Sequence, residues 1–158
     1  MSELQTVSRD ETIAVDALVD EVLVDLEPLA QEKEIKLIGN CNDTTMVGSD
    51  ILIYRMVYNL VENAIKYNHF GGQVTVTAYR KGKNICLSVE DTGSGIPAEL
   101  KERIFEPFFR VDKSRSRQLG GVGLGLALVH EIVRVHDGRI TVQSSPSGGT
   151  IFEVVFTQ

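Results

Sequence analysis

The chain has 158 residues, a length typical of one domain, and its 42% hydrophobic and 24% charged residues are ordinary for a globular protein. The net charge of −6 argues against a surface that binds nucleic acid or an anionic membrane. No apolar run is long enough to span a bilayer and no signal-peptide pattern is present, so we expect neither a membrane-spanning helix nor a secretory leader. Cys41 and Cys86 lack metal-binding spacing and are interpreted as reduced thiols in the cytoplasm.

The hydrophobic pattern predicts helices and strands along most of the chain. Residues 1–10 are interpreted as a linker remnant, followed by a single domain over residues 11–158. In chain order we expect a strand at 11–15, a helix at 16–32, strands at 35–39 and 45–48, a helix at 50–68, strands at 73–79 and 84–90, a short helix at 98–103, a helix at 126–136, and strands at 140–143 and 150–156. Ser49 or Asp50 is expected to cap the second long helix.

The helix at 50–68 carries the first candidate site, on a narrow polar stripe. At about 100° per residue, the stripe consists of Arg55, Asn59, Glu62, Asn63 and Lys66. Asn is a poor helix former, and two Asn amide oxygens one turn apart, followed by an ammonium group, suit a hard cation next to a phosphate. An ordinary solvent-exposed helix face is the alternative from this helix alone.

The second candidate site follows the strand at 84–90. Its sequence is Asp91-Thr92-Gly93-Ser94-Gly95. An Asp at a strand end can accept a hydrogen bond from the amino group of a base, and the two glycines allow a flat ring to approach the backbone closely. A plain turn with an Asp cap is the alternative.

Two further segments in the second half are unusual. Half of the six Phe residues lie at 105–109, where core packing is the ordinary interpretation, and the basic stretch at 110–119 predicts a mobile loop. The glycines at 120–125 open the helix at 126–136, and free N–H groups at a helix N-terminus can bind an anion. The segment is neither a Walker A loop nor a dinucleotide fingerprint in its usual context.

The order of these motifs resembles the catalytic, ATP-binding domain of two-component sensor histidine kinases, in the superfamily that includes gyrase B and MutL. Residues 59–67 resemble the N box, 91–95 the first glycine box, 105–108 the F box, 121–126 the second glycine box, and 148–150 the last turn of the family. The resemblance implies an α/β two-layer sandwich, the Bergerat ATP-binding fold, with a mixed, mainly antiparallel sheet and three helices on one face. It covers nearly the whole chain.

The resemblance also implies a role for each matching residue. Asn63 would be the main Mg²⁺ ligand with Asn59 beside it, Lys66 would meet a phosphate, and Asp91 would accept the adenine amino group. Arg110, and less directly Arg115 or Arg117, would neutralise the γ-phosphate from the loop. The expected nucleotide contacts are Asn59, Asn63, Lys66, Tyr67, Asp91, Gly93, Gly95, Ile96, Arg110, Arg115, Gly121, Val122, Gly123, Leu124, Gly125, Leu126 and Thr150.

The chain departs from a complete kinase because no His has the phosphoacceptor sequence. His130-Glu131 lacks the Pro that follows in that motif, and Arg134 stands where the HExxH zinc motif has its second His. We therefore expect an excised, monomeric catalytic domain that uses ATP and Mg²⁺, does not autophosphorylate alone, and acts on the His domain of a membrane-anchored parent kinase and through it on a response regulator. We expect the domain itself to be cytoplasmic and to contact neither membrane nor nucleic acid.

Three other functions remain as alternatives. ATPases of the gyrase kind carry a Glu as general base at the position of Asn59, which disfavours hydrolysis here. A serine kinase of the anti-sigma type shares the fold, but the residues at 63–67 and 108–117 look more like those of histidine kinases. A non-catalytic nucleotide-binding module is disfavoured because every expected ligand position holds a competent residue.

Overall fold

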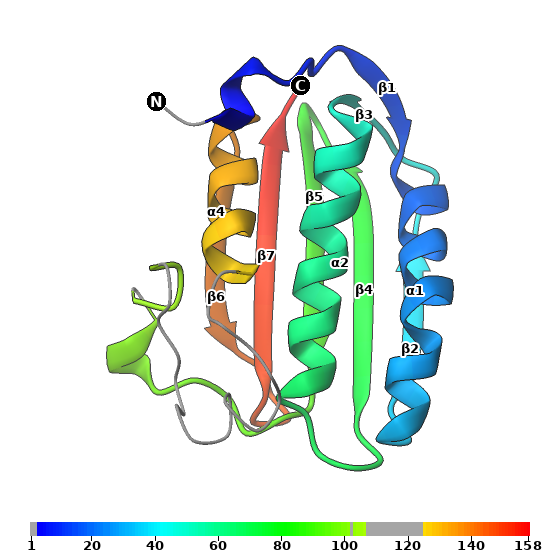
Figure 1. Cartoon of the computed structure of the whole chain (residues 1–158), viewed down its shortest axis with the longest axis vertical. Coiled ribbons are helices and arrows are strands. Elements are labelled where there is room, and N and C mark those ends of the chain that lie inside the picture. The colour runs from blue at the N-terminus through cyan, green and yellow to red at the C-terminus, as the bar shows by residue number, and fades with distance from the viewer. Residues whose placement is uncertain (1–2, 102, 107–124) are drawn as a thin grey trace.

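A computed structural model describes residues 3–101, 103–106 and 125–158 of the chain (Figure 1). The elements are η1 (Glu3–Thr6), β1 (Glu11–Ala14), α1 (Val15–Glu32), β2 (Lys36–Cys41), β3 (Thr45–Gly48), α2 (Asp50–Lys66), β4 (Gln73–Lys81), β5 (Asn84–Asp91), η2 (Ala98–Leu100), α4 (Gly125–Val135), β6 (Arg139–Ser144) and β7 (Thr150–Thr157). Among the described residues, no helix is both long and apolar enough to cross a membrane.

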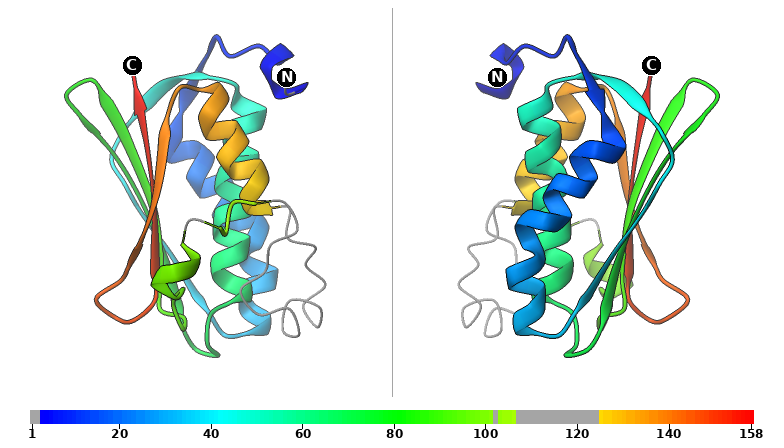
Figure 2. Two further views of the ribbon diagram at one scale, coloured as in Figure 1. Left: turned by 90° about the vertical axis from the view of Figure 1, so that its left-hand side faces the viewer. Right: turned by 90° about the vertical axis from the view of Figure 1, so that its right-hand side faces the viewer.

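The main sheet has five strands in the order β2-β4-β5-β7-β6. Strands β2 and β4 are parallel, and the other neighbours are antiparallel. A separate antiparallel pair joins β1 to β3. Helices α1, α2 and α4 lie on one face of the five-stranded sheet, with α2 between the other two (Figures 1 and 2). The predicted mixed, mainly antiparallel sheet with three helices on one face is therefore confirmed.

The core lies between these two layers. On β4, Val74, Val76 and Ala78 alternate with more exposed residues and are fully buried, as the sequence pattern predicts. The apolar side of α2 is also buried, and Ser49 caps this helix by accepting a hydrogen bond from the Leu52 N–H at 3.3 Å. The fold therefore buries one side of α2 and leaves the side with its polar stripe turned away from the sheet.

Most predicted elements differ from the structure by one or two residues at an end, and two of the differences have a clear physical cause. A helix is predicted at 98–103, but only the 3-10 turn η2 forms, because the hydrogen bonds from Leu100 and Lys101 each close on a carbonyl three residues earlier. Strand β2 is longer than predicted, since its pairing with β4 continues to Cys41, opposite Ala78. Neither difference changes the architecture.

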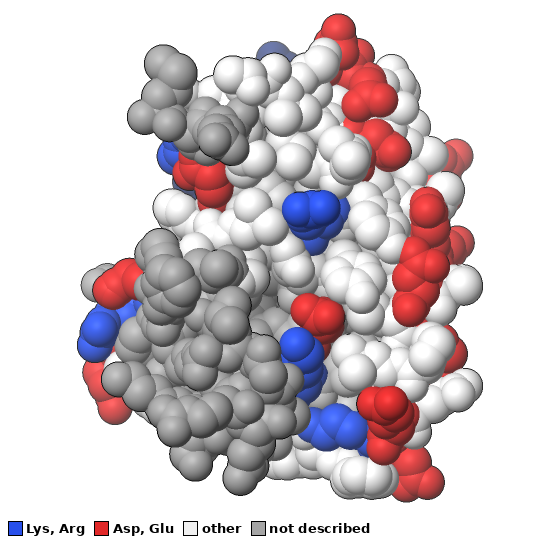
Figure 3. All heavy atoms as spheres, in the orientation of Figure 1, with Lys and Arg blue, Asp and Glu red and all other residues white. Residues whose placement is uncertain are grey.

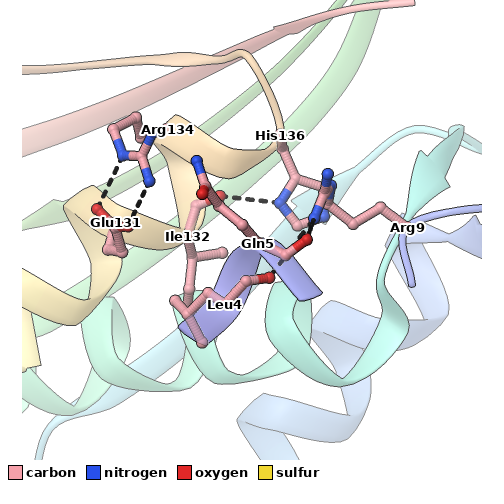
Figure 4. A network of polar contacts seen from close by, with 7 residues as sticks. All are labelled: Leu4, Gln5, Arg9, Glu131, Ile132, Arg134 and His136. Atoms are coloured by element: carbon pink, nitrogen blue, oxygen red, sulfur yellow. Dashed lines mark hydrogen bonds and ion pairs between the residues drawn. The ribbon is translucent and has the colours of Figure 1, made fainter. Parts of the chain in front are cut away.

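The N-terminal segment packs near the C-terminal end of α4, at His136 (Figure 4). Nη1 of Arg9 donates to the carbonyls of Gln5 and Val7, each at 3.1 Å. Nε2 of His136 accepts the N–H of Ser49 at 3.0 Å, so Nδ1 carries the proton and donates to the Ile132 carbonyl at 2.8 Å. The neutral imidazole thus links α4 to the start of α2.

Replacing His136 with Gln is expected to weaken the dependence of stability on pH. Burial lowers the pKa of His136 and Arg9 lowers it further, while the hydrogen bond to Ile132 and the charge of Asp137 oppose them. Near and below about pH 6.5 the unfolded state therefore binds more protons at this His than the folded state does. The free energy of unfolding of the wild type then falls as the pH is lowered through this range. A Gln amide can accept from Ser49 without titrating.

Chemical denaturation between about pH 5 and about pH 8 measures this difference. His130→Gln, which replaces an exposed His on the same helix, is the matched control. An unchanged pH slope in His136→Gln would contradict the assignment.

Candidate functional site

The end of α2 provides the first part of the site. Asn59, Asn63, Lys66 and Tyr67 are all half-buried, and they lie on or directly after the polar stripe. Nζ of Lys66 lies 3.8 Å from Oε1 of Glu62, one turn earlier. Figure 3 shows acidic side chains gathered on the side where α1 lies and basic side chains closer to α2. Many acidic side chains of this face therefore lie over α1, while Glu62 lies within the stripe beside Lys66.

Asp91, the last residue of β5, provides the second part. Its side chain is buried, and its Oδ1 accepts the N–H of Gly93 at 2.8 Å. Burial raises the pKa of Asp91, and hydrogen bonds from the backbone of Gly93 and of Thr150 oppose this rise. The protein thus holds a hydrogen-bond acceptor in a fixed orientation at a position with little water.

Glycines allow the segments around Asp91 to touch. A Cβ on Gly93 would lie 2.6 Å from the carbonyl oxygen of Tyr67, and a Cβ on Gly149 would lie 2.0 Å from that of Asp91. Gly95 has a φ of +80°, and its Cβ would lie 2.7 Å from the carbonyl oxygen of Gly148. The end of α2, the loop after β5 and the turn before β7 are therefore in direct contact, whereas the approach of a flat ring to this loop stays a prediction.

Two residues near this contact, Asn68 and Lys33, were missed by sequence reasoning. Asn68 is fully buried directly after α2, and its Oδ1 accepts from the hydroxyl of Thr92 at 3.2 Å. Lys33, at the end of α1, donates to backbone carbonyls 32 to 35 residues further along the chain. An Asn after a helix often binds nearby backbone, which is a sequence signal for Asn68. No local signal exists for Lys33, because its partners are distant in sequence.

The described part of the F box packs against the sheet, and the described part of the second glycine box belongs to α4. Ile104 is buried, and the ring of Phe105 packs edge-on against Phe152, with centroids 6.2 Å apart. Gly125 and Leu126 open α4, so the described part of the second glycine box lies at a helix N-terminus, as predicted.

The sequence around His130 forms no metal site. Its ring lies 5.4 Å from the ring of Phe105, and Glu131 is paired with Arg134 at 2.6 Å. In the described ranges no three His, Cys, Asp or Glu side chains come together in a way that could hold a metal ion.

Several predicted contacts lie outside the described residues. They are Arg110, Arg115, Arg117, Gly121, Val122, Gly123 and Leu124. Ile96 is described and packs against the core, and Thr150 is buried at the start of β7. The described site therefore combines a buried carboxylate with a helix face that carries amide oxygens and an ammonium group.

Comparison of the sequence with known proteins identifies the family of this chain. The profile of the histidine kinase-, DNA gyrase B- and HSP90-like ATPases matches residues 48–158. The sensor-like histidine kinase SenX3 of Mycobacterium tuberculosis is 40% identical over 141 residues, which are 89% of this chain and 34% of SenX3. The chain thus spans about a third of that curated relative.

Solved structures agree with the sequence comparison. The catalytic domain of the histidine kinase ThkA, in a nucleotide-free form, superposes with a TM-score of 0.84 at 27% identity, covering 95% of this chain and 96% of that one. ThkA in complex with the response regulator TrrA gives a TM-score of 0.79 at 26% identity, covering 94% of this chain and 41% of that one. The chain therefore belongs to the histidine kinase-, DNA gyrase B- and HSP90-like ATPases, on the sensor histidine kinase side of that family.

Proposed function

We propose that this chain binds ATP with Mg²⁺ and transfers the γ-phosphate to a His on a separate dimerisation domain. The observation that carries the proposal is the buried Asp91 carboxylate, oriented by Gly93 and Thr150 next to the polar end of α2. Such a group recognises a base, while the helix face recognises phosphates. The phosphorylated His would then supply a response regulator, in keeping with the complex of ThkA with the response regulator TrrA.

In this proposal the adenine ring binds at the loop after β5. The free acceptor capacity of Asp91 would take the adenine amino group, because the backbone N–H groups of Gly93 and Thr150 use only part of it. Gly93, Gly95 and Ile96 would line the ring, and Tyr67 would flank it.

The residues of α2 fit a magnesium ion bound with phosphates. Asn63 and Asn59 would offer neutral amide oxygens, the hard donors that Mg²⁺ prefers when substrate phosphates supply the rest of its shell. Bound Mg²⁺ would supply charge neutralisation on the phosphates. Lys66 would contact a phosphate directly, and its ion pair with Glu62 orients the ammonium group before the nucleotide arrives.

The chemistry is then phosphoryl transfer by positioning and charge neutralisation. An amide at Asn59 cannot take a proton from water, and Glu62 lies about 60° round the helix from Asn59. The described residues around Asn59 thus favour transfer to a protein over hydrolysis. Arg110, with Arg115 or Arg117, remains the predicted source of positive charge at the γ-phosphate, and the backbone of Gly121, Val122, Gly123 and Leu124 the predicted phosphate cradle.

We further propose where the domain works. It would be a monomer when isolated, lie in the cytoplasm, and belong to a parent kinase anchored in the cell membrane. It would contact neither the membrane nor nucleic acid, in keeping with its net charge of −6.

Transfer in trans tests the proposal. The chain, incubated with γ-labelled ATP and Mg²⁺, is expected to remain unlabelled, whereas a dimerisation domain added from a related sensor kinase is expected to become labelled on His. Phosphate release without an acceptor would favour the ATPase alternative. Nucleotide binding without labelling of several such domains would favour a non-catalytic module.

A further inference from the structure

The ammonium group of Lys33 holds the end of α2 from outside the site. Lys33 follows α1, and its Nζ donates to the carbonyls of Ile65 at 3.2 Å, Lys66 at 2.9 Å and Asn68 at 2.8 Å. The last carbonyls of a helix have no partner within the helix, and the negative end of the helix dipole lies there. One cation therefore binds two carbonyls of the last turn of α2 and one carbonyl just beyond it, at the end of the helix that carries the candidate phosphate ligands.

The buried side chain of Asn68 extends this connection to the base loop. Its Nδ2 donates to the Gln73 carbonyl at 3.1 Å, and its Oδ1 accepts from the His69 N–H at 2.8 Å and the Thr92 hydroxyl at 3.2 Å. Thr92 stands between Asp91 and Gly93. The connection thus runs from α1 through the end of α2 into the loop that orients the buried carboxylate.

The end of α2 and the loop after β5 are packed so tightly that neither can move without displacing the other. The carbonyl oxygen of Tyr67 lies so close to Gly93 that a Cβ there would be 2.6 Å from it. A small rotation of the last turn of α2 would therefore displace Gly93 and, through its hydrogen bond, the carboxylate of Asp91. Binding sites tolerate only small displacements of this kind.

We propose that Lys33 is a positioning residue of the nucleotide site, acting through the last turn of α2 and Asn68 without touching the nucleotide. The inference rests on the proposed nucleotide-binding function. Lys33 holds the backbone at Lys66 and Tyr67 in a fixed position relative to the loop at Asp91. The hydrogen bond between Thr92 and Asn68 connects that loop to the same segment.

Calorimetric titration with ADP and Mg²⁺ compares the wild type with Lys33→Met, Lys33→Arg and Lys83→Met. Met keeps the aliphatic stem and loses the ammonium group, so ADP affinity is expected to fall about tenfold, as for a lost hydrogen bond to a charged group. Arg keeps the charge and is expected to stay within about threefold of the wild type. Lys83, exposed at the other end of β5, is the matched control and should change nothing.

Two precautions distinguish a displaced nucleotide site from a general loss of stability. First, all titrations are made at a temperature at which thermal melts show each variant fully folded. In addition, the amide resonance of Gly93 is expected to move in Lys33→Met, to return in Lys33→Arg and to stay in place in Lys83→Met, because this N–H reports the geometry at Asp91.

A variant at the far end of the connection keeps the test decisive if Lys33→Met does not fold. Thr92→Val preserves the shape and removes the hydroxyl that donates to Asn68, so it should also weaken ADP binding. Unchanged ADP affinity in Thr92→Val, or in folded Lys33→Met, would overturn this inference alone. Absence of ADP binding by the wild type would overturn the proposed function and this inference with it.

Discussion

Replacing Asp91 with Asn is expected to lower the affinity for ADP at least about a hundredfold. The amide oxygen of Asn would keep accepting from the backbone N–H groups of Gly93 and Thr150, which fix the orientation of the side chain. The NH₂ group would then take the place of the second carboxylate oxygen. Two donors, this NH₂ and the amino group of adenine, would face each other at a position with little water.

Titration calorimetry with ADP, with and without Mg²⁺, measures this loss. Asp137→Asn is the matched control, because it removes the same charge at an exposed turn where φ is +57° and Asn is well tolerated. Affinity in Asp91→Asn within about threefold of the wild type would show that the base binds elsewhere. An equal loss in both variants would instead indicate an effect of net charge.

The sequence predicts most of this site because its motifs are local. The polar stripe of α2 follows from helical spacing alone, and the position of Asp91 at the end of a strand, directly before the loop with Gly93, follows from the alternation of β5. The alternation in β4 likewise predicts which of its side chains are buried. In each case neighbours in sequence determine the geometry.

The remaining features depend on contacts between distant segments. Lys33 has no distinguishing sequence context, and only the packing of α1 beside α2 brings its Nζ to the carbonyls of α2. The same holds for Gly149, whose backbone touches Asp91 from the turn before β7. Strand β2 outlasts its apolar pattern because β4 supplies pairing partners up to Cys41. Register and packing, which a single sequence does not reveal, determine these features.

Replacing Asn63 with Ala is expected to reduce phosphoryl transfer about a hundredfold and to remove the gain in ADP affinity that Mg²⁺ provides. The reason is the loss of a neutral amide oxygen on the half-buried stripe, one turn from Asn59. Binding of ADP without Mg²⁺ should change little, because Asp91 and its neighbours stay intact. The helix should tolerate the change, since Ala is the best helix former and the Asn63 backbone carbonyl still accepts from the Tyr67 N–H.

Ile51→Ala is the matched control for this prediction, because Ile51 is exposed on the same helix, about three turns earlier and outside the polar stripe. Its nucleotide affinity and transfer rate should equal those of the wild type. If Asn63→Ala kept a Mg²⁺-dependent gain in ADP affinity, the ion would not be held by this amide, and Asn59 would become the ligand to test. If transfer fell while the Mg²⁺-dependent gain persisted, Asn63 would act on the geometry of the phosphates and not on the ion, because a metal ligand must affect both measurements.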